Sequence, residues 1–207
     1  IYDFSVTLTG CNVAERNDSF IQYYNPFVDV FSVNFFAKAP DIPAPLSNVD
    51  AIRNFYREML IRNNMGLIQC DVHPICGVPA VYFLAKLMME PRGFLFLASY
   101  TIPRQKHSYV LKYQAAESGV TGMRETAVMA LLPTPEIDEL TNKISGWCTD
   151  PYDNTLEYSV MRNQADSEEY DSMFPDHPLS RSRRFMAELP SVVTLSDNLR
   201  STPEFSR

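Results

Sequence analysis

Four stretches with the composition of β-strands follow one another between residues 67 and 115, and the turns between them are short. The connecting segments at 91–93 and 103–107 contain Pro and have the length of hairpin turns. Such turns join antiparallel neighbours, because a parallel crossover needs a dozen residues or more. The sequence therefore predicts an antiparallel sheet, with strands at Leu67–Val72, Val78–Met88, Gly93–Ile102 and Ser108–Ala115.

Apolar residues occupy both faces of these predicted strands. Along 93–102, Phe94 and Phe96 lie on one face, whereas Leu95 and Leu97 lie on the other. This pattern is typical of a strand buried between two layers. We therefore expect the sheet to be covered on both sides, at least in its middle.

The N-terminal part adds two more predicted strands, at 2–9 and 28–37. Apolar and polar residues alternate from Phe31 to Phe35, which is the period of a strand with one buried face. The segment from Pro40 to Pro45 holds three prolines, and proline disfavours both helix and ladder pairing. We interpret it as an extended connector inside the domain.

A helix is expected at 49–64, directly before the sheet. Its apolar residues recur at helical spacing, so one face can pack on the strands. Ser47 and Asp50 have the spacing of a capping box, and Gly66 suits a left-handed residue past the helix end.

Three further helices are predicted downstream, at 121–132, 135–144 and 179–189. Pro133 would stop the first of them, and Thr134 would cap the second. Pro178 would stand at the first position of the third. Strands and helices together give an α+β fold, an antiparallel sheet flanked by helices, followed by a C-terminal acidic loop and helix.

Length and composition favour one domain. The chain has 207 residues, of which 45% are hydrophobic, so a single core is expected. We expect residues 1–146 to form the sheet-and-helix core and residues 147–207 to pack on it as an extension. No apolar run is long enough to span a membrane, and we expect a cytoplasmic protein. The first residue is Ile1 rather than Met, which indicates a trimmed N-terminus.

The charge balance argues against nucleic acid as a partner. There are 25 acidic and 18 basic residues, which gives a net charge of −7. Cys70 and Cys76 flank His73, but their spacing is not that of a zinc knuckle, so buried thiols at a hairpin are expected. We predict neither a cofactor nor a metal ion.

The segment between 149 and 177 is the most acidic part of the chain. Its carboxylates face a single base, Arg162, and they lack the rhythm of an EF-hand loop. A charge run of this kind is typical of a solvated loop, with a surface for another protein and a site for a hard cation as the functional alternatives. The candidate partner-binding residues are Asp150, Asp153, Glu168, Glu169 and Asp171.

His177 is the most informative single residue for chemistry. It lies next to Asp176 at a predicted helix entrance, so Asp171, Asp176 and His177 are the candidate catalytic residues. A catalytic Asp–His pair needs a nucleophile or a bound water, and the sequence identifies none. The alternative is structural, with Asp176 capping the helix and His177 on the surface.

The start of the helix at 121–132 is a candidate anion site. Thr121 and Arg124 lie near exposed amide groups, but Glu117 and Glu125 would repel an anion. A helix-start motif is therefore the favoured interpretation.

The order of elements from residue 28 to 132 resembles the α/β/α sandwich of the PsbP-like superfamily. The strings Asp150-Pro151-Tyr152-Asp153 and 174–180, FPDHPLS, are similar to strings in uncharacterised bacterial proteins. The second resemblance implies a full-length relative, but it brings no activity.

These observations favour a non-catalytic protein-binding or adaptor domain. The Gly-x-Ser-x-Gly elbow, the phosphate-binding Gly-rich loop and the His-Glu-x-x-His helix are all missing from the sequence. One alternative is a hydrolase or metal-assisted hydrolase that uses His177 and nearby carboxylates. A second is a small-ligand carrier with an aromatic pocket between sheet and helix.

Overall fold

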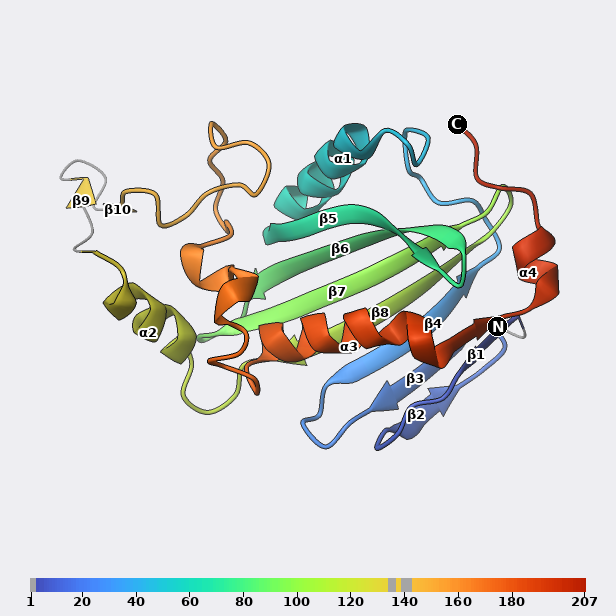
Figure 1. The fold of residues 1–207 in the computed structure, drawn as a ribbon, viewed down its shortest axis with the longest axis horizontal. Coiled ribbons are helices and arrows are strands. Elements are labelled where there is room, and N and C mark those ends of the chain that lie inside the picture. The colour runs from blue at the N-terminus through green and yellow to red at the C-terminus, as the bar shows by residue number, and fades with distance from the viewer. Residues whose placement is uncertain (1–2, 134–136, 139–142) are drawn as a thin grey trace.

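A computed structural model describes residues 3–133, 137–138 and 143–207. Its centre is a seven-stranded sheet in the order β2-β3-β4-β8-β7-β6-β5, in which every neighbouring pair is antiparallel (Figure 1). The strands are β2 (Asn12–Arg16), β3 (Phe20–Tyr24), β4 (Val30–Phe36), β5 (Met65–Ile75), β6 (Val78–Met88), β7 (Phe94–Pro103) and β8 (Ser108–Ala116). The predicted α+β class and its antiparallel sheet are therefore confirmed.

The four predicted central strands β5 to β8 form, and β5 is longer than expected. It continues through His73 and Pro74 to Ile75 and pairs with β6 over that whole stretch. The two strands are joined by Cys76 and Gly77, both with positive φ, at 50° and 81°. This conformation suits a two-residue hairpin, whose twist matches that of the strands. Cys70 is buried, as predicted, whereas Cys76 is half-buried.

Helix α1 (Val49–Arg62) covers one face of the sheet, close to its predicted range. Ile52, Tyr56 and Leu60 pack there on apolar side chains of β5 and β6. The cap differs from the prediction, because the side chain of Asn48, not Ser47, accepts the Ala51 N–H. Asn ranks with Ser among N-cap residues, so the capping-box spacing of Ser47 placed the cap one residue too early, although the predicted start at residue 49 is confirmed.

Helix α3 (Pro178–Val192) covers the other face. Its buried side chains include Leu179, Met186 and Leu189, which belong to the larger apolar core with β4, β6, β7 and β8. The helix runs past the predicted end at Leu189 and includes Pro190. Beside α3, the short strands β1 (Phe4–Val6) and β11 (Val193–Leu195) pair with each other, and helix α4 (Asp197–Ser201) follows (Figure 1).

The N-terminal part contains the two predicted strands, as β1 and β4, and two further strands. The expected strand at 2–9 is the short β1, which joins β11 instead of the large sheet. Strands β2 and β3 were not predicted. All five residues of β2 are exposed, so its sequence carries little of the apolar alternation that indicates a strand. A register shift near Ala14 further interrupts the pairing of β2 with β3.

Helix α2 (Met123–Leu131) lies within its predicted range. The helix expected at 135–144 falls largely outside the described residues. Where that segment is described, it forms the short antiparallel strands β9 (Ile137–Asp138) and β10 (Lys143–Ile144), so helix is the wrong prediction at those four positions. Two short 3₁₀ helices, Gln164–Asp166 and Glu168–Tyr170, lead toward α3.

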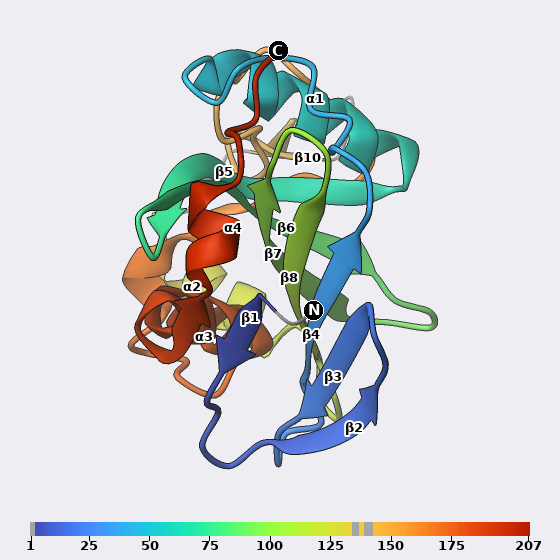
Figure 2. The ribbon, with the colours of Figure 1, turned by 90° about the vertical axis from the view of Figure 1, so that its right-hand side faces the viewer.

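The two faces of the sheet are covered to different extents. Side chains from β5, β6 and β7 belong to the core beneath α1. On the same side of β8, β4 and β3, no helix of the described residues lies over the strands (Figure 2). The predicted two-sided cover therefore holds for one half of the sheet. No described helix is long and apolar enough to cross a membrane.

Gly66 lies in β5 and does not have the left-handed conformation predicted for it; Asn64 does, with φ 53°. Position 66 requires glycine for a different reason, since a Cβ there would lie 2.6 Å from the carbonyl oxygen of Val160. The close approach seats the C-terminal segment against β5.

We predict that Gly66→Ala destabilises the chain by about 1–3 kcal/mol, because a backbone oxygen cannot move aside as a flexible side chain would. Urea unfolding followed by circular dichroism measures the change. Gly119→Ala is the matched control, since a Cβ at Gly119 meets nothing within 4 Å although φ is 70°. An equal or smaller loss for Gly66→Ala than for the control would contradict the close-packing explanation.

Candidate functional site

The C-terminal segment is attached to the sheet by buried charges instead of forming a solvated loop. Asp150 has a fully buried side chain and bonds Arg57 of α1 twice, with Nε–Oδ2 2.7 Å and Nη2–Oδ1 2.8 Å. The carboxylate also accepts from the Tyr158 hydroxyl and the Tyr152 N–H. Burial alone would raise the pKa of Asp150, but these donors hold it below its ordinary value.

Tyr152 protects the outer edge of β5. Its hydroxyl accepts from the Cys70 N–H at 2.7 Å and donates to the Cys70 carbonyl at 2.9 Å. The guanidinium of Arg53 lies over the Tyr152 ring, 4.0 Å from its centre. The unpaired N–H and C=O groups of an edge strand can pair with a strand of another chain. Here the Tyr152 side chain forms hydrogen bonds with both of these groups of Cys70. The Asp150-Pro151-Tyr152-Asp153 string thus acts as a clip between α1 and β5.

A second buried pair lies further along the segment. Lys86 of β6 and Asp166 are 2.5 Å apart, and both side chains are almost completely buried. Asp166 also accepts from the Asn163 N–H, while Asn163 accepts from the Asp166 N–H in return. A charge buried this deeply is costly without a partner, so the pair fixes the first 3₁₀ helix against the sheet.

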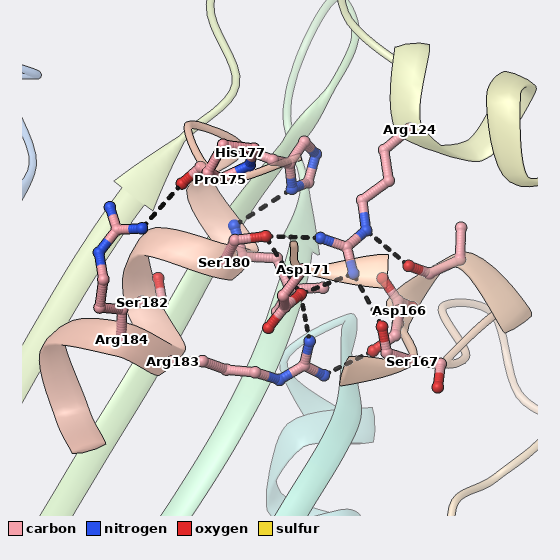
Figure 3. A network of polar contacts seen from close by, with 12 residues as sticks. Arg124, Asp166, Ser167, Asp171, Pro175, His177, Ser180, Ser182, Arg183 and Arg184 are labelled. Carbon is pink, nitrogen blue, oxygen red and sulfur yellow. Dashed lines mark hydrogen bonds and ion pairs between the residues drawn. The ribbon is translucent and has the colours of Figure 1, made fainter. Parts of the chain in front are cut away.

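Arg124 of α2 is the centre of a network with the segment from Ala165 to Ser180 (Figure 3). Its side chain is 1% exposed. It donates to the carbonyls of Ala165 and Ser167, to the Ser180 hydroxyl and to Asp171 Oδ1, at 2.6–2.8 Å. The enclosure of Arg124 could not be predicted from local sequence patterns, because its partners lie more than 40 positions away.

The three candidate catalytic residues do not come together as a catalytic unit. The Oδ1 atom of Asp171 is shared by Arg124, Arg183 and Ser180 (Figure 3). Asp176 is exposed, and its carbonyl accepts from Arg181. His177 is the cap of α3 in place of the predicted Asp176, and its Nδ1 accepts the Leu179 N–H at 3.3 Å.

The predicted surface position of His177 is wrong, since its side chain is only 10% exposed. The Pro at position 178 opens the helix and the ring lies edge-on against Phe96, which buries it. Its Nε2 atom is 3.4 Å from Glu117 Oε1. The carboxylate beside His177 is therefore Glu117, which follows β8, and neither Asp171 nor Asp176.

Glu117, Glu125 and His177 form a cluster whose ligand atoms all lie within 4.8 Å of one another. Glu117 accepts from the Phe94 N–H and the Gly122 N–H; although burial opposes its charge, these bonds and His177 lower its pKa. Burial, together with the charge of Glu117, raises the pKa of Glu125. The sequence interpretation of Glu117 and Glu125 as helix-start charges missed the imidazole between them.

Three cavities lined by described residues lie next to α3. One, of about 300 Å³, is lined by Glu117, Val120, Arg124, Phe174 and His177, among others. Another, of about 390 Å³, lies between α3 and the loops that flank β1 and β3, and Phe27, Tyr113 and Phe185 are among its lining residues. The third, of about 150 Å³, lies between β5–β7 and α3 and is lined by Tyr82 and Tyr100, among others. Aromatic side chains therefore line cavities between the sheet and α3, and the small-ligand carrier stays a prediction.

The five candidate partner-binding residues separate into two groups. Asp150 and Asp171 are engaged by arginines inside the molecule, so their carboxylates are not available to a partner in this conformation. Glu168 and Glu169 are exposed, and Asp153 is half-buried. The acidic run was predicted to be solvated because a sequence does not show which distant arginines its carboxylates meet.

On the half of the sheet that α1 leaves uncovered (Figure 2), the register places a set of polar side chains, here called the polar sheet face: Gln22, Asn34, Lys112 and Gln114, which are half-buried, and Ser32, which is buried among them. The register places Ser32 between Gln22 and Lys112 on neighbouring strands. Asn34 donates to the Ser32 hydroxyl at 3.1 Å. Tyr24 and Phe36 stand at its borders, 43% and 44% exposed.

No family model matches the chain, and no curated protein matches it. Among solved structures, it is similar to a mutant of the protein Mog1, with 10% identity over 95% of this chain and 93% of that chain and a TM-score of 0.49. It is also similar to cyanobacterial PsbP from Synechocystis, with 10% identity over 62% of this chain and 81% of that chain and a TM-score of 0.38. LpqN of Mycobacterium tuberculosis aligns with 15% identity over 61% and 75% of the two chains, at a TM-score of 0.30.

None of these neighbours places the chain in a family. The PsbP-like sandwich and the kinship with proteins that carry the DPYD and FPDHPLS strings stay predictions. So does the division of the chain into a core of residues 1–146 and an extension of residues 147–207.

We predict that Arg124→Met lowers the free energy of unfolding by at least about 3 kcal/mol, because it leaves Asp171 and two buried carbonyls short of donors. Thermal and urea unfolding measure the loss. Arg184→Met is the control on α3, where the exposed Arg184 bonds only the Pro175 carbonyl among the hydrogen bonds of the described residues. Its effect should stay within about 0.5 kcal/mol. Equal losses in Arg124→Met and Arg184→Met would show that the enclosure of Arg124 contributes nothing to the free energy of unfolding.

The lowered pKa of Asp150 predicts an acid-sensitive contribution to stability. A carboxyl with a lower pKa in the folded state stabilises the fold above its unfolded value of about 3.9, and this contribution is lost as the pH falls through the folded value. Asp150→Asn should therefore be much less stable than the unsubstituted chain at pH 7. The difference should narrow below about pH 4, as urea unfolding at several pH values would show. A difference that is constant with pH would contradict this assignment.

Proposed function

We propose that this chain is a non-catalytic protein-binding domain that engages its partner through the polar sheet face. The observation that carries the proposal is the incomplete cover of the sheet. Helix α1 packs over β5 and β6, whereas β8, β4 and β3 have no described helix on that side (Figure 2). A sheet face that the chain does not cover itself can be covered by another molecule.

The chemistry of the polar sheet face suits a protein partner. Lys112 lies at its centre, and half-buried amides surround it, so the face offers both donors and acceptors. Tyr24 and Phe36 add exposed aromatic area at the borders. Aromatic residues are enriched in protein interfaces, and polar rims with many hydrogen-bonding groups are typical of contacts that form and dissociate. Asp153, Glu168 and Glu169 remain a second proposed contact region.

The state of the candidate catalytic residues also favours a binding role. Asp171 shares its carboxylate with two arginines, and Ser180 donates to that carboxylate instead of to an imidazole. An activated serine needs a base within hydrogen-bond reach. Among the described residues, no histidine is bonded to Ser180.

A pair of variants tests the proposal. The immobilised chain is used to capture specific partners from an extract of the source cells. We expect Asn34→Arg with Lys112→Glu to abolish this capture, because the second substitution reverses the charge at the centre of the face and the first places a bulky side chain there. Glu168→Lys with Glu169→Lys is the control, matched in number of substitutions, on the second contact region. Folding of both is checked by thermal unfolding.

Lysine footprinting gives a second measurement on the unsubstituted chain. In the complex, Lys112 should lose reactivity toward an acylating reagent, whereas the exposed Lys38 should keep it. If partners bind the Asn34/Lys112 variant as well as the unsubstituted chain, and Lys112 stays reactive, the polar sheet face is not the interface. Loss of partners only in the Glu168/Glu169 variant would move the interface to the second region.

A further inference from the structure

We propose that Glu117, Glu125 and His177 bind one divalent transition-metal ion, a site independent of the proposed protein-binding face. The three residues come from separate elements. Glu117 follows β8, Glu125 lies in the first turn of α2, and His177 caps α3. A bound ion would therefore join the two helices to the end of the sheet.

The distances suit a small ion with tetrahedral coordination. His177 Nε2 and Glu117 Oε1 are 3.4 Å apart. Two ligand atoms each about 2.1 Å from a tetrahedral zinc ion lie about 3.4 Å apart, so this pair already has the required separation. The carboxylate of Glu125 completes a set within 4.8 Å, and a change in its flexible side chain brings it to coordination distance.

Two atoms of the cluster are buried without a hydrogen-bond partner, and this is what distinguishes it from a structural ion pair. They are His177 Nε2 and Glu125 Oε2. Buried polar atoms are nearly always satisfied in folded proteins, so two orphans facing one space indicate an absent ligand. His177 is nine-tenths buried, and its ring is fixed against Phe96.

The charge of the cluster calls for a cation. Among the ion pairs of the described residues, none joins a Lys or Arg to Glu117 or Glu125. Arg124 is the neighbour of Glu125 in the sequence, but its donors are used by Asp171, Ser180 and two carbonyls (Figure 3). A divalent ion would neutralise both carboxylates at once.

The hydrogen bond accepted by Nδ1 of His177 indicates which kind of ion the site would bind. Because Nδ1 of His177 accepts the Leu179 N–H at 3.3 Å, a neutral ring without an ion carries its proton on Nε2. Coordination through Nε2 moves that proton to Nδ1 and removes this long hydrogen bond. Only an ion with high affinity for imidazole offsets that loss, which favours Zn²⁺ over Mg²⁺ and Ca²⁺. The adjacent cavity of about 300 Å³, which Glu117 and His177 both line, gives the ion an entry path.

Zn²⁺ titration of the full, chelator-stripped chain by calorimetry tests the site, in a Cys148→Ser background that removes the exposed thiol. We expect one Zn²⁺ per chain and a rise in melting temperature with Zn²⁺, but none with Mg²⁺ or Ca²⁺. Glu125→Gln should weaken Zn²⁺ binding by at least about tenfold, since even outer-shell partners contribute that much. The same variant should fold as well as the parent without Zn²⁺, because it removes a buried charge.

His177→Asn is the second variant, chosen because Asn still caps α3 while the imidazole is lost. It too should lose Zn²⁺ binding. Asp176→Asn is the control, an exposed carboxylate that lines the same cavity but lies outside the cluster. The proposal is overturned if the parent chain takes up no Zn²⁺, if Glu125→Gln binds it unchanged, or if Asp176→Asn loses as much affinity as Glu125→Gln.

Discussion

The arrangement of the molecule depends on pairing buried charges that are far apart in the sequence. Arg57 with Asp150, Lys86 with Asp166, and Arg124 with Asp171 each join the C-terminal third to the sheet or to a helix on it. Arg181 of α3 likewise bonds Asp29 at the start of β4. A buried ion pair often adds little net stability, but a buried charge without its partner is strongly unfavourable. We infer that these pairs determine where the segment docks more than how tightly it is held.

The same pairs explain what the sequence could and could not predict. The central strands and α1 follow from local patterns, namely apolar runs, short Pro and Gly turns and helical spacing, and they were predicted close to their true ranges. β2 has five exposed residues and no such pattern, so it was missed. The run from Asp150 to Asp176 reads as a solvated acidic loop for a related reason. Asp150, Asp166 and Asp171 look exposed until the position of the arginine or lysine that pairs with each is known.

The candidate site could likewise be predicted only in part from the sequence. His177 stood out in the sequence because of its neighbours Asp176 and Pro178, yet the carboxylates beside it are 52 and 60 positions away, at Glu125 and Glu117. The polar sheet face could not be foreseen either. Lys112 and Gln114 are ordinary polar positions of an alternating strand, and only the placement of α1 over the opposite half of the sheet leaves them without cover.

The pairing of β1 with β11 has a consequence for how the chain folds. Asp3 accepts from Ser196 and Asn198, and Asp29 bonds Arg181 across 152 positions. Residues near the start of the sequence are therefore held in place by residues near its end. Contacts this distant in sequence are slow to form, because a long loop must close before they can contribute. During synthesis, the sheet face beneath α3 stays without its helix until residues 178–192 have left the ribosome, well after the strands that the helix covers. The nascent chain therefore exposes the apolar side chains of this face during the interval between the synthesis of β8 and that of α3.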